Sequence, residues 1–137
     1  MILLLDLGNT NLYVGIIKEG TLICEFRTDS DLNRSSYMYL DLLRNFIEKN
    51  KFNTNDFEGA ILSSVIPSLT YSISKSVEDL LQKPCLILSK EIKSGLSIRI
   101  DNPSELGTDL IADSIGAIKR YGAPCIICDL GTANKLL

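Results

Sequence analysis

The chain has 137 residues, of which 45% are hydrophobic and 23% charged, with a formal net charge of −3 at pH 7. These values are typical of a globular domain and argue against a partner that presents a nucleic-acid backbone or an anionic membrane surface. The sequence contains no histidine, which excludes Ser-His and Cys-His catalytic pairs and leaves acid–base chemistry to carboxylates.

The chain opens on an apolar run, Ile2 to Leu5, that leads into Asp6 and the polar sequence Gly8-Asn9-Thr10-Asn11. This is the pattern of a buried strand that delivers a carboxylate into a tight turn. Two further β-rich runs, 12–18 and 21–27, are separated by a Glu-Gly turn signal. We therefore expect a three-stranded antiparallel meander.

Helices and strands alternate in the middle of the chain. Apolar spacing and short apolar runs predict a helix from Ser35 or Ser36 to about Asn50, a strand at 59–66, a helix from about Ser68 to Leu81 and a strand at 84–88. Pro67 is expected to stop the earlier strand, because proline has no N–H for the ladder. The order βββαβαβ predicts an α/β fold, a mixed sheet flanked by helices with parallel crossovers.

The last third of the sequence carries a weaker extended segment, 94–100, and then a helix predicted to start at Ser104 and to end at Tyr121. Asp109 and Asp113 are four residues apart on that helix, so they are expected to share one face. A final strand is predicted over 124–130.

That final strand ends in a second copy of the opening pattern. In Asp129-Leu-Gly-Thr-Ala-Asn134, the Asp, Leu, Gly and Asn stand at the same offsets as in Asp6-Leu-Gly-Asn-Thr-Asn11. Two such turns favour a duplicated fold in which each half contributes to a phosphate site. We expect residues 1–122 to form a first α/β domain and residues 123–137 to be the first strand and phosphate turn of an otherwise missing second domain. The chain alone is then expected to be inactive.

The cysteines and the N-terminal sequence bear on the cellular compartment. Cys24, Cys85, Cys125 and Cys128 lie in or beside apolar runs, which predicts buried reduced thiols in place of a disulfide framework. The N-terminal apolar run meets Asp6 at once and has no basic region before it, so neither a signal peptide nor a membrane span is predicted. Cytoplasmic residence is expected.

Two groups of residues could carry chemistry. The turn after Asp6 offers backbone N–H groups, a hydroxyl and amides that can cradle an anion, and Asp6 could hold a hydrated divalent cation that bridges to a phosphate. Asp109, which follows Gly107 by two residues, could accept the proton of an attacking alcohol. An ordinary strand-ending turn and a solvated helix face bearing Asp109 and Asp113 remain open as simpler interpretations. The repeat at Asp129 favours a Mg·nucleotide site.

Four motifs occur in order: Asp6-Leu-Gly-Asn-Thr-Asn11, Ser63-Ser-Val-Ile-Pro67, Asp101-Asn-Pro-Ser-Glu-Leu-Gly-Thr-Asp109 and Asp129-Leu-Gly-Thr-Ala133. Together they resemble those of the type III pantothenate kinases, members of the actin/hexokinase/Hsp70-like superfamily of duplicated ribonuclease-H-like domains. The resemblance implies ATP-dependent phosphorylation of pantothenate to 4′-phosphopantothenate, the first step of coenzyme A biosynthesis. It also implies a cytoplasmic homodimer that requires Mg²⁺ and a monovalent cation, K⁺ or NH₄⁺.

The resemblance assigns roles position by position. It implies that Asp109 is the proton acceptor, that Asp129 is a ligand of the monovalent cation, and that Asp6 holds Mg²⁺ through water. The implied ATP contacts are Asp6, Leu7, Gly8, Asn9, Thr10, Asn11, Leu12, Tyr13 and Thr132. The implied pantothenate contacts are Ile100, Gly107, Thr108, Asp109 and Leu110.

Three positions depart from the family pattern. Leu110 replaces the usual substrate-binding arginine, and a leucine cannot make the bidentate contact that an arginine gives to a carboxylate. Ile100 replaces a tyrosine that commonly lines the pantothenate pocket, and Asn134 interrupts the second phosphate motif. ATP binding by the complete protein is therefore better supported than pantothenate specificity.

Two alternatives from other functional classes remain. One is a non-catalytic nucleotide-binding regulator on the same fold, which has lost the substrate arginine at position 110. The other is a ribonuclease-H-like metal-dependent nuclease, against which the acidic charge and the glycine-amide turn after Asp6 argue. ATP consumption in the presence of pantothenate separates the kinase from the regulator.

Overall fold

The computed structural model describes residues 1–89, 91–92, 94–102, 106–131 and 134–137. The chain divides into two compact units, Met1–Leu88 and Ser89–Leu137. Within the described ranges, no helix is both long enough and apolar enough to cross a membrane.

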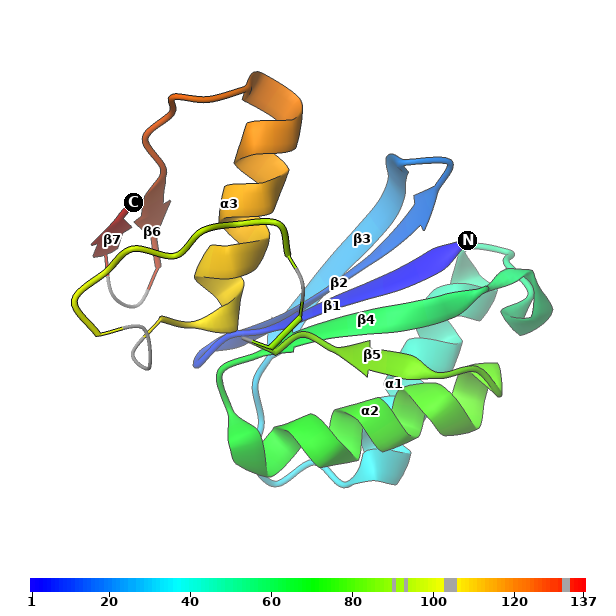
Figure 1. The fold of residues 1–137 in the computed structure, drawn as a ribbon. Helices are drawn as coiled ribbons and strands as arrows, with labels where there is room; N and C mark the ends of the chain where they lie inside the picture. The colour runs from blue at the N-terminus through cyan, green and yellow to red at the C-terminus, as the bar shows by residue number, and fades with distance from the viewer. Residues whose placement is uncertain (90, 93, 103–105, 132–133) are drawn as a thin grey trace. The chain divides into compact units, whose positions relative to one another are not determined.

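The first unit is built on a five-stranded mixed sheet (Figure 1). Its strands are β1 (Ile2–Leu7), β2 (Asn11–Lys18), β3 (Thr21–Asp29), β4 (Gly59–Ser64) and β5 (Cys85–Ile87). Their order across the sheet is β3-β2-β1-β4-β5. The pairs β1–β2 and β2–β3 are antiparallel, whereas β4 runs parallel to both β1 and β5. The predicted mixed sheet, with its antiparallel meander and its parallel crossovers, is confirmed.

The helices of this unit lie close to their predicted limits. Helix α1 spans Ser36–Lys49, and the Ser35 side chain caps it by accepting a 3.3 Å hydrogen bond from the backbone N–H of Met38. A short 3₁₀ turn, η1 (Thr54–Asp56), precedes β4. Helix α2 spans Pro67–Leu81, so the proline that ends the strand segment is also the first helical residue, where its missing N–H costs no hydrogen bond.

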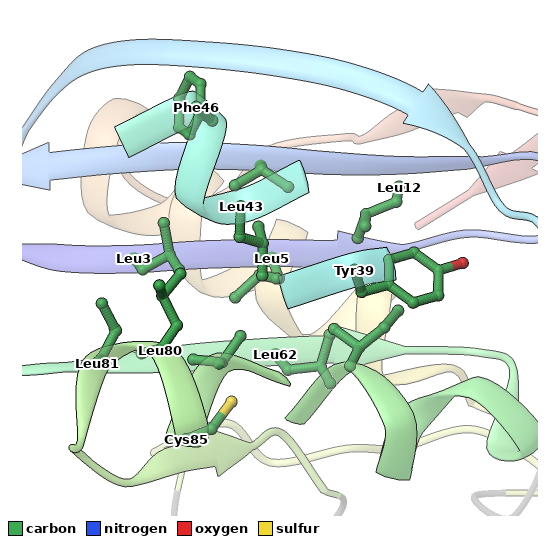
Figure 2. Close-up of a cluster of buried hydrophobic side chains, with 14 of the residues drawn as sticks. Leu3, Leu5, Leu12, Tyr39, Leu43, Phe46, Leu62, Leu80, Leu81 and Cys85 are labelled. Atoms are coloured by element: carbon green, nitrogen blue, oxygen red, sulfur yellow. The ribbon is translucent and has the colours of Figure 1, made fainter. Parts of the chain in front are cut away.

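Both helices pack on one face of the sheet, where the core lies (Figures 1 and 2). Alternate residues of β1, Leu3, Leu5 and Leu7, are almost fully buried there because successive strand side chains point to opposite faces. Figure 2 shows Leu43 of α1 and Leu80 and Leu81 of α2 in the same buried cluster as Leu3 and Leu5. The same alternation places Asp6 on the opposite face, where its side chain is exposed.

The second unit contains helix α3 (Thr108–Tyr121) and a two-stranded hairpin of β6 (Cys128–Leu130) and β7 (Asn134–Leu136). The helix starts at Thr108, later than predicted, because Gly107 is extended (φ −69°, ψ 151°) and forms the N-cap. The predicted cap, Ser104, lies outside the described residues. The predicted segment 94–100 forms no strand, and the final strand is limited to β6, since its only partner among the described residues is three residues long.

The prediction of four buried thiols is wrong for two of them. Cys85 is buried and Cys24 is partly buried, but Cys125 and Cys128 are exposed. Cys125 lies before the short hairpin, and Cys128 lies on a strand that pairs only with β7 among the described residues. A two-stranded ribbon does not enclose side chains as the layered first unit does.

Candidate functional site

The turn after Asp6 is a closed hairpin connection between β1 and β2. Leu7 and Leu12 face each other across it, and both are fully buried. Within the turn, the backbone N–H of Gly8 donates to the carbonyl of Asn11 at 2.9 Å. The two leucine side chains therefore anchor the turn in the core, whereas Asn9 and Thr10 are exposed. Any ligand of this turn would meet the residues between the leucines, with Leu7 and Leu12 contributing backbone atoms only.

Ser30, which the sequence analysis did not single out, holds this turn from the end of β3. Its hydroxyl donates to the carbonyl of Gly8 at 2.7 Å, and its backbone N–H donates to the carbonyl of Thr10 at 2.8 Å. The backbone carbonyls of Gly8 and Thr10 are therefore occupied by hydrogen bonds from Ser30. Pre-ordering of a loop in this way lowers the entropy cost of binding a ligand.

Asp6 has a polar neighbour on each side. Its register partners are Tyr13 on β2 and Ser63 on β4. The Ser63 side chain is buried, and its hydroxyl has no hydrogen-bond partner among the described residues. A buried hydroxyl without a partner is uncommon and requires an explanation, and a ligand that reaches the ends of β1 and β4 would supply one.

Arg27 brings a positive charge to the same face of the sheet. It is the register partner of Tyr13, its Nη1 donates to the Tyr13 hydroxyl at 3.2 Å, and its guanidinium lies 5.7 Å from the Tyr13 ring centroid. Strands β1, β2 and β3 thus align Asp6, Tyr13 and Arg27 in one row. The sequence analysis missed Arg27, because its place beside Tyr13 depends on the pairing of β2 with β3.

The residues around Asp6 fit an indirectly bound Mg²⁺ better than a directly ligated metal. Over the part of the chain that the structure describes, no three His, Cys, Asp or Glu side chains are grouped so that they could hold a metal ion. Mg²⁺ commonly keeps several waters and is held by one or two carboxylates together with substrate phosphates. The exposed Asp6 carboxylate is compatible with that mode.

In the second unit, Asp109 lies at the start of α3, close to the N-cap Gly107. Asp109 Oδ1 accepts a hydrogen bond from the backbone N–H of Leu110 at 2.9 Å. A Cβ atom built on Gly107 would collide with Asp109 Oδ1. Gly107 therefore leaves room for the Asp109 carboxylate in its observed position, which explains the glycine at this place in the motif.

Lys135 joins Asp109 to Asp129. Its Nζ lies 2.6 Å from Asp109 Oδ2 and 3.4 Å from Asp129 Oδ2. The hydrogen bond to Asp109 is the largest contribution that raises the pKa of Lys135, and Asp129 adds to it. The Asp113 side chain on the same helix is exposed, but its pKa is raised by partial desolvation and then by the charges of Asp129 and Asp109. The three carboxylates thus belong to one electrostatic cluster, and the sequence analysis overlooked its cation.

A groove of about 500 Å³ opens beside this cluster, between α3 and the hairpin. Asp113 and Arg120 of α3 and Cys128 and Asp129 of β6 line part of it. Its volume is in the range of small-molecule sites, and its walls carry charges of both signs. The groove lies within the second unit.

The remaining predicted contacts are spread over the second unit. The Leu110 side chain is partly buried, Thr108 is also partly buried, and Ile100 is 45% exposed. Thr132, an expected ATP contact, lies outside the described residues. The second unit therefore brings together Asp109, Leu110 and Asp129 of the predicted residues, and the first unit brings together those from Asp6 to Tyr13.

The family model and the most similar curated proteins name the same family. The family model "Type III pantothenate kinase" matches residues 2–136. Proteins with that name from Finegoldia magna and Shouchella clausii are each 38% identical to this chain, over 133 and 135 residues. The matches cover 97% and 98% of this chain but 51% and 53% of those proteins. The chain thus spans about half the length of the curated relatives it matches.

Solved structures with a similar fold include YeaZ from Pseudomonas aeruginosa, at 16% identity and a TM-score of 0.49 over 64% of this chain and 43% of that chain. Another is a protein of unknown function with an actin-like ATPase fold from Bacteroides thetaiotaomicron. It is 8% identical, with a TM-score of 0.48 over 63% of this chain and 31% of that chain.

Proposed function

The chain belongs to the type III pantothenate kinase family, and from this premise we propose that it supplies part of an enzyme that phosphorylates pantothenate with ATP. The product is 4′-phosphopantothenate, and the reaction is the first step of coenzyme A biosynthesis. The observation that carries the proposal is the family match over residues 2–136. The complete protein is proposed to act in the cytoplasm as a homodimer.

The first unit supplies the nucleotide-binding role in this proposal. The turn from Asp6 to Tyr13 binds the ATP phosphates, with its backbone fixed by Ser30. Asp6 would hold Mg²⁺ through water, and a metal there would supply positive charge opposite the phosphoryl group that is transferred. Thr132 makes a further ATP contact in the second phosphate motif.

The second unit supplies the acceptor role. Asp109 accepts the proton of the pantothenate hydroxyl, with its position fixed by the backbone N–H of Leu110. Gly107, Thr108, Leu110 and Ile100 line the pantothenate site, and the apolar Leu110 cannot pair with the pantothenate carboxylate as the family's arginine would. Asp129 takes the position of the cation ligand, but the Lys135 ammonium beside it does not fit a bound K⁺.

One observation favours the non-catalytic nucleotide-binding regulator as a second candidate. Both carboxylate oxygens of Asp109 already accept hydrogen bonds, Oδ1 from the Leu110 N–H and Oδ2 from Lys135. An alcohol proton must compete with these donors for the carboxylate. Together with Leu110, this arrangement is what a scaffold that binds nucleotide without phosphorylating pantothenate would show.

The test uses the protein expressed from its complete reading frame, with ATP, pantothenate, Mg²⁺ and K⁺. The kinase proposal predicts ADP release that depends on pantothenate, and it predicts that Asp109→Asn lowers kcat by about 100-fold or more while ATP still binds. Tight ATP binding without turnover would refute the kinase proposal and favour the non-catalytic regulator. Unchanged turnover in Asp109→Asn would remove Asp109 from the role of base. The 137-residue chain tested alone is expected to be inactive.

A further inference from the structure

The second phosphate hairpin differs from the first in its register. In the first hairpin, Leu7 pairs with Leu12 and Asp6 pairs with Tyr13. In the second, Leu130 pairs with Asn134 and Asp129 pairs with Lys135. Four positions, 8–11, separate the paired residues Leu7 and Leu12 in the first hairpin. Three positions, 131–133, separate the paired residues Leu130 and Asn134 in the second. The second hairpin therefore closes one residue earlier.

This shift decides which side chain faces the aspartate. With the register of the first hairpin, Leu136 would stand opposite Asp129. With the observed register, Lys135 stands there, and residues directly opposite in a strand pair have side chains on the same face. The Lys135 ammonium consequently reaches both Asp129 Oδ2, at 3.4 Å, and Asp109 Oδ2, at 2.6 Å.

An ammonium group in this place has the chemistry of a bound monovalent cation. It carries one positive charge, has three hydrogen-bond donors and has no acceptor. It lies within ion-pair distance of both the Asp129 and the Asp109 carboxylates. A second cation there would meet a like charge at close range, which the local electrostatics oppose.

We propose that Lys135 is a built-in replacement for the monovalent cation at Asp129, so that this site binds neither K⁺ nor NH₄⁺. The covalently attached ammonium pairs with the carboxylates of both Asp109 and Asp129 and so supplies the positive charge that a free ion would otherwise bring to Asp129. The identification of Asp129 as a cation position rests on the proposed function. The ion pairs of Lys135 with Asp109 and Asp129 do not depend on the proposed function.

The first test measures cation binding to the protein without an activity assay. Thallium(I) is the probe for K⁺, followed by ²⁰⁵Tl NMR, and the melting temperature is compared in KCl and choline chloride at equal ionic strength. The parent protein is expected to show no saturable Tl⁺ binding and no K⁺-specific rise in Tm. Lys135→Met removes the ammonium and keeps an apolar stem. It is expected to bind Tl⁺ and to gain about 5 °C in KCl, the rise expected when the ligand exceeds its dissociation constant roughly tenfold.

Lys135→Arg is the matched control, because it keeps the positive charge and is expected to remain insensitive to K⁺. Saturable Tl⁺ binding by the parent protein would overturn the proposal, and so would a folded Lys135→Met variant without a K⁺ response. If Lys135→Met folds only with added salt, rescue by KCl but not by choline chloride supports the proposal. Failure of KCl to rescue it counts against the proposal.

Turnover separates this inference from the proposed function. If the complete protein phosphorylates pantothenate, its kcat is expected to be the same in KCl and choline chloride, and Lys135→Met is expected to become K⁺-dependent. A complete protein with no kinase activity that still shows the Tl⁺ pattern would refute the kinase and retain the cation replacement. If the parent protein phosphorylates pantothenate only in the presence of K⁺, the kinase is retained and the cation replacement by Lys135 is refuted.

Discussion

Asp6 and Ser63 lie directly opposite each other on β1 and β4, and the Ser63 hydroxyl, in a side chain that is only 7% exposed, has no partner among the described residues. A buried hydroxyl normally forms a hydrogen bond, because leaving it unpaired costs about 1–3 kcal/mol. A ligand bound at the proposed phosphate turn beside it would give this hydroxyl a partner.

Replacement of Ser63 by alanine should therefore affect binding more than folding. We expect Ser63→Ala to leave the free energy of unfolding unchanged or to raise it by up to about 1 kcal/mol, because an unpaired polar group is removed. We expect the affinity of the complete protein for Mg·ATP to fall by about fivefold to tenfold, the loss of one hydrogen bond. Urea unfolding and calorimetric titration measure the two effects.

Ser76 is the matched control for this prediction. It is also buried, but its hydroxyl contacts the carbonyls of Ser36 and Ser72, both at 2.6 Å. Ser76→Ala should lower the free energy of unfolding by about 1 kcal/mol. Equal destabilisation by Ser63→Ala and Ser76→Ala would show that the Ser63 hydroxyl has a partner in the folded protein, contrary to the prediction.

Ser30→Ala tests whether the first phosphate turn is held from β3. The variant loses the 2.7 Å hydrogen bond to the carbonyl of Gly8, so we expect the free energy of unfolding to fall by about 1 kcal/mol. Hydrogen exchange of the Gly8 amide, which donates to the Asn11 carbonyl, should become faster than in the parent. Ser68→Ala, at an exposed serine of α2, should change neither quantity, and an unaltered Gly8 exchange rate in Ser30→Ala would contradict the anchoring role.

The first unit could be predicted from the sequence because its signals are local. The alternation of Leu3, Leu5 and Leu7 with exposed or partly exposed residues specifies a strand with one buried face, and Ser35 marks the start of α1 as a side-chain cap. Each of these signals agrees with the packing around it. Local sequence and tertiary structure therefore gave the same answer.

The second unit was predicted less well because its structure depends on pairing. The apolar residues before β6 are typical of a buried strand, yet β6 pairs with only three residues of β7 and leaves Cys125 and Cys128 exposed. In the site, Asp6, Asp109 and Asp129 were found because motifs carry them. Lys135 and Arg27 were not, since a register shift of one residue would move each of them away from its partner.

The four thiols should react at rates set by their burial. Burial is the main cause that raises the pKa of Cys85 to about 11, and the nearby Glu78 charge adds to it. We expect Cys125 and Cys128, which are exposed, to react with Ellman's reagent at once at pH 8. Cys24, partly buried and also with a raised pKa, should react more slowly, and Cys85 should react only when the protein opens. Rapid modification of Cys85 would contradict its placement in the core.

Cys85 should also make folding stability depend on alkaline pH. Its pKa in the folded protein lies above the ordinary value of 9.0, so the unfolded chain loses the thiol proton first. Stability from this group is complete below pH 9 and is lost as pH rises toward about 11, by about 3 kcal/mol in total. Cys85→Ala should show a correspondingly shallower decline in urea unfolding over this range, and identical slopes in parent and variant would refute the assignment.

Gly107 and Gly116 should respond in opposite directions to alanine. A Cβ on Gly107 would collide with Asp109 Oδ1, whereas a Cβ on Gly116 in α3 meets no atom within 4 Å. Gly107→Ala should displace the carboxylate and lower the free energy of unfolding by about 1 kcal/mol, through loss of its hydrogen bonds. Gly116→Ala should raise it by about 0.5–1 kcal/mol, because alanine loses less backbone entropy in a helix.

The pKa of Lys135 reports whether the Asp109 carboxylate keeps its position. The hydrogen bond to Asp109 is the largest cause of the raised Lys135 pKa, so Gly107→Ala should bring that pKa back toward the ordinary lysine value. ¹³C NMR of the labelled lysine side chain through an alkaline titration measures it, with Gly116→Ala expected to match the parent. A Gly107→Ala protein that is as stable as the parent and keeps the raised pKa would mean that the carboxylate does not need the space that this glycine leaves. The motif would then need another explanation for its glycine, such as close approach of a substrate.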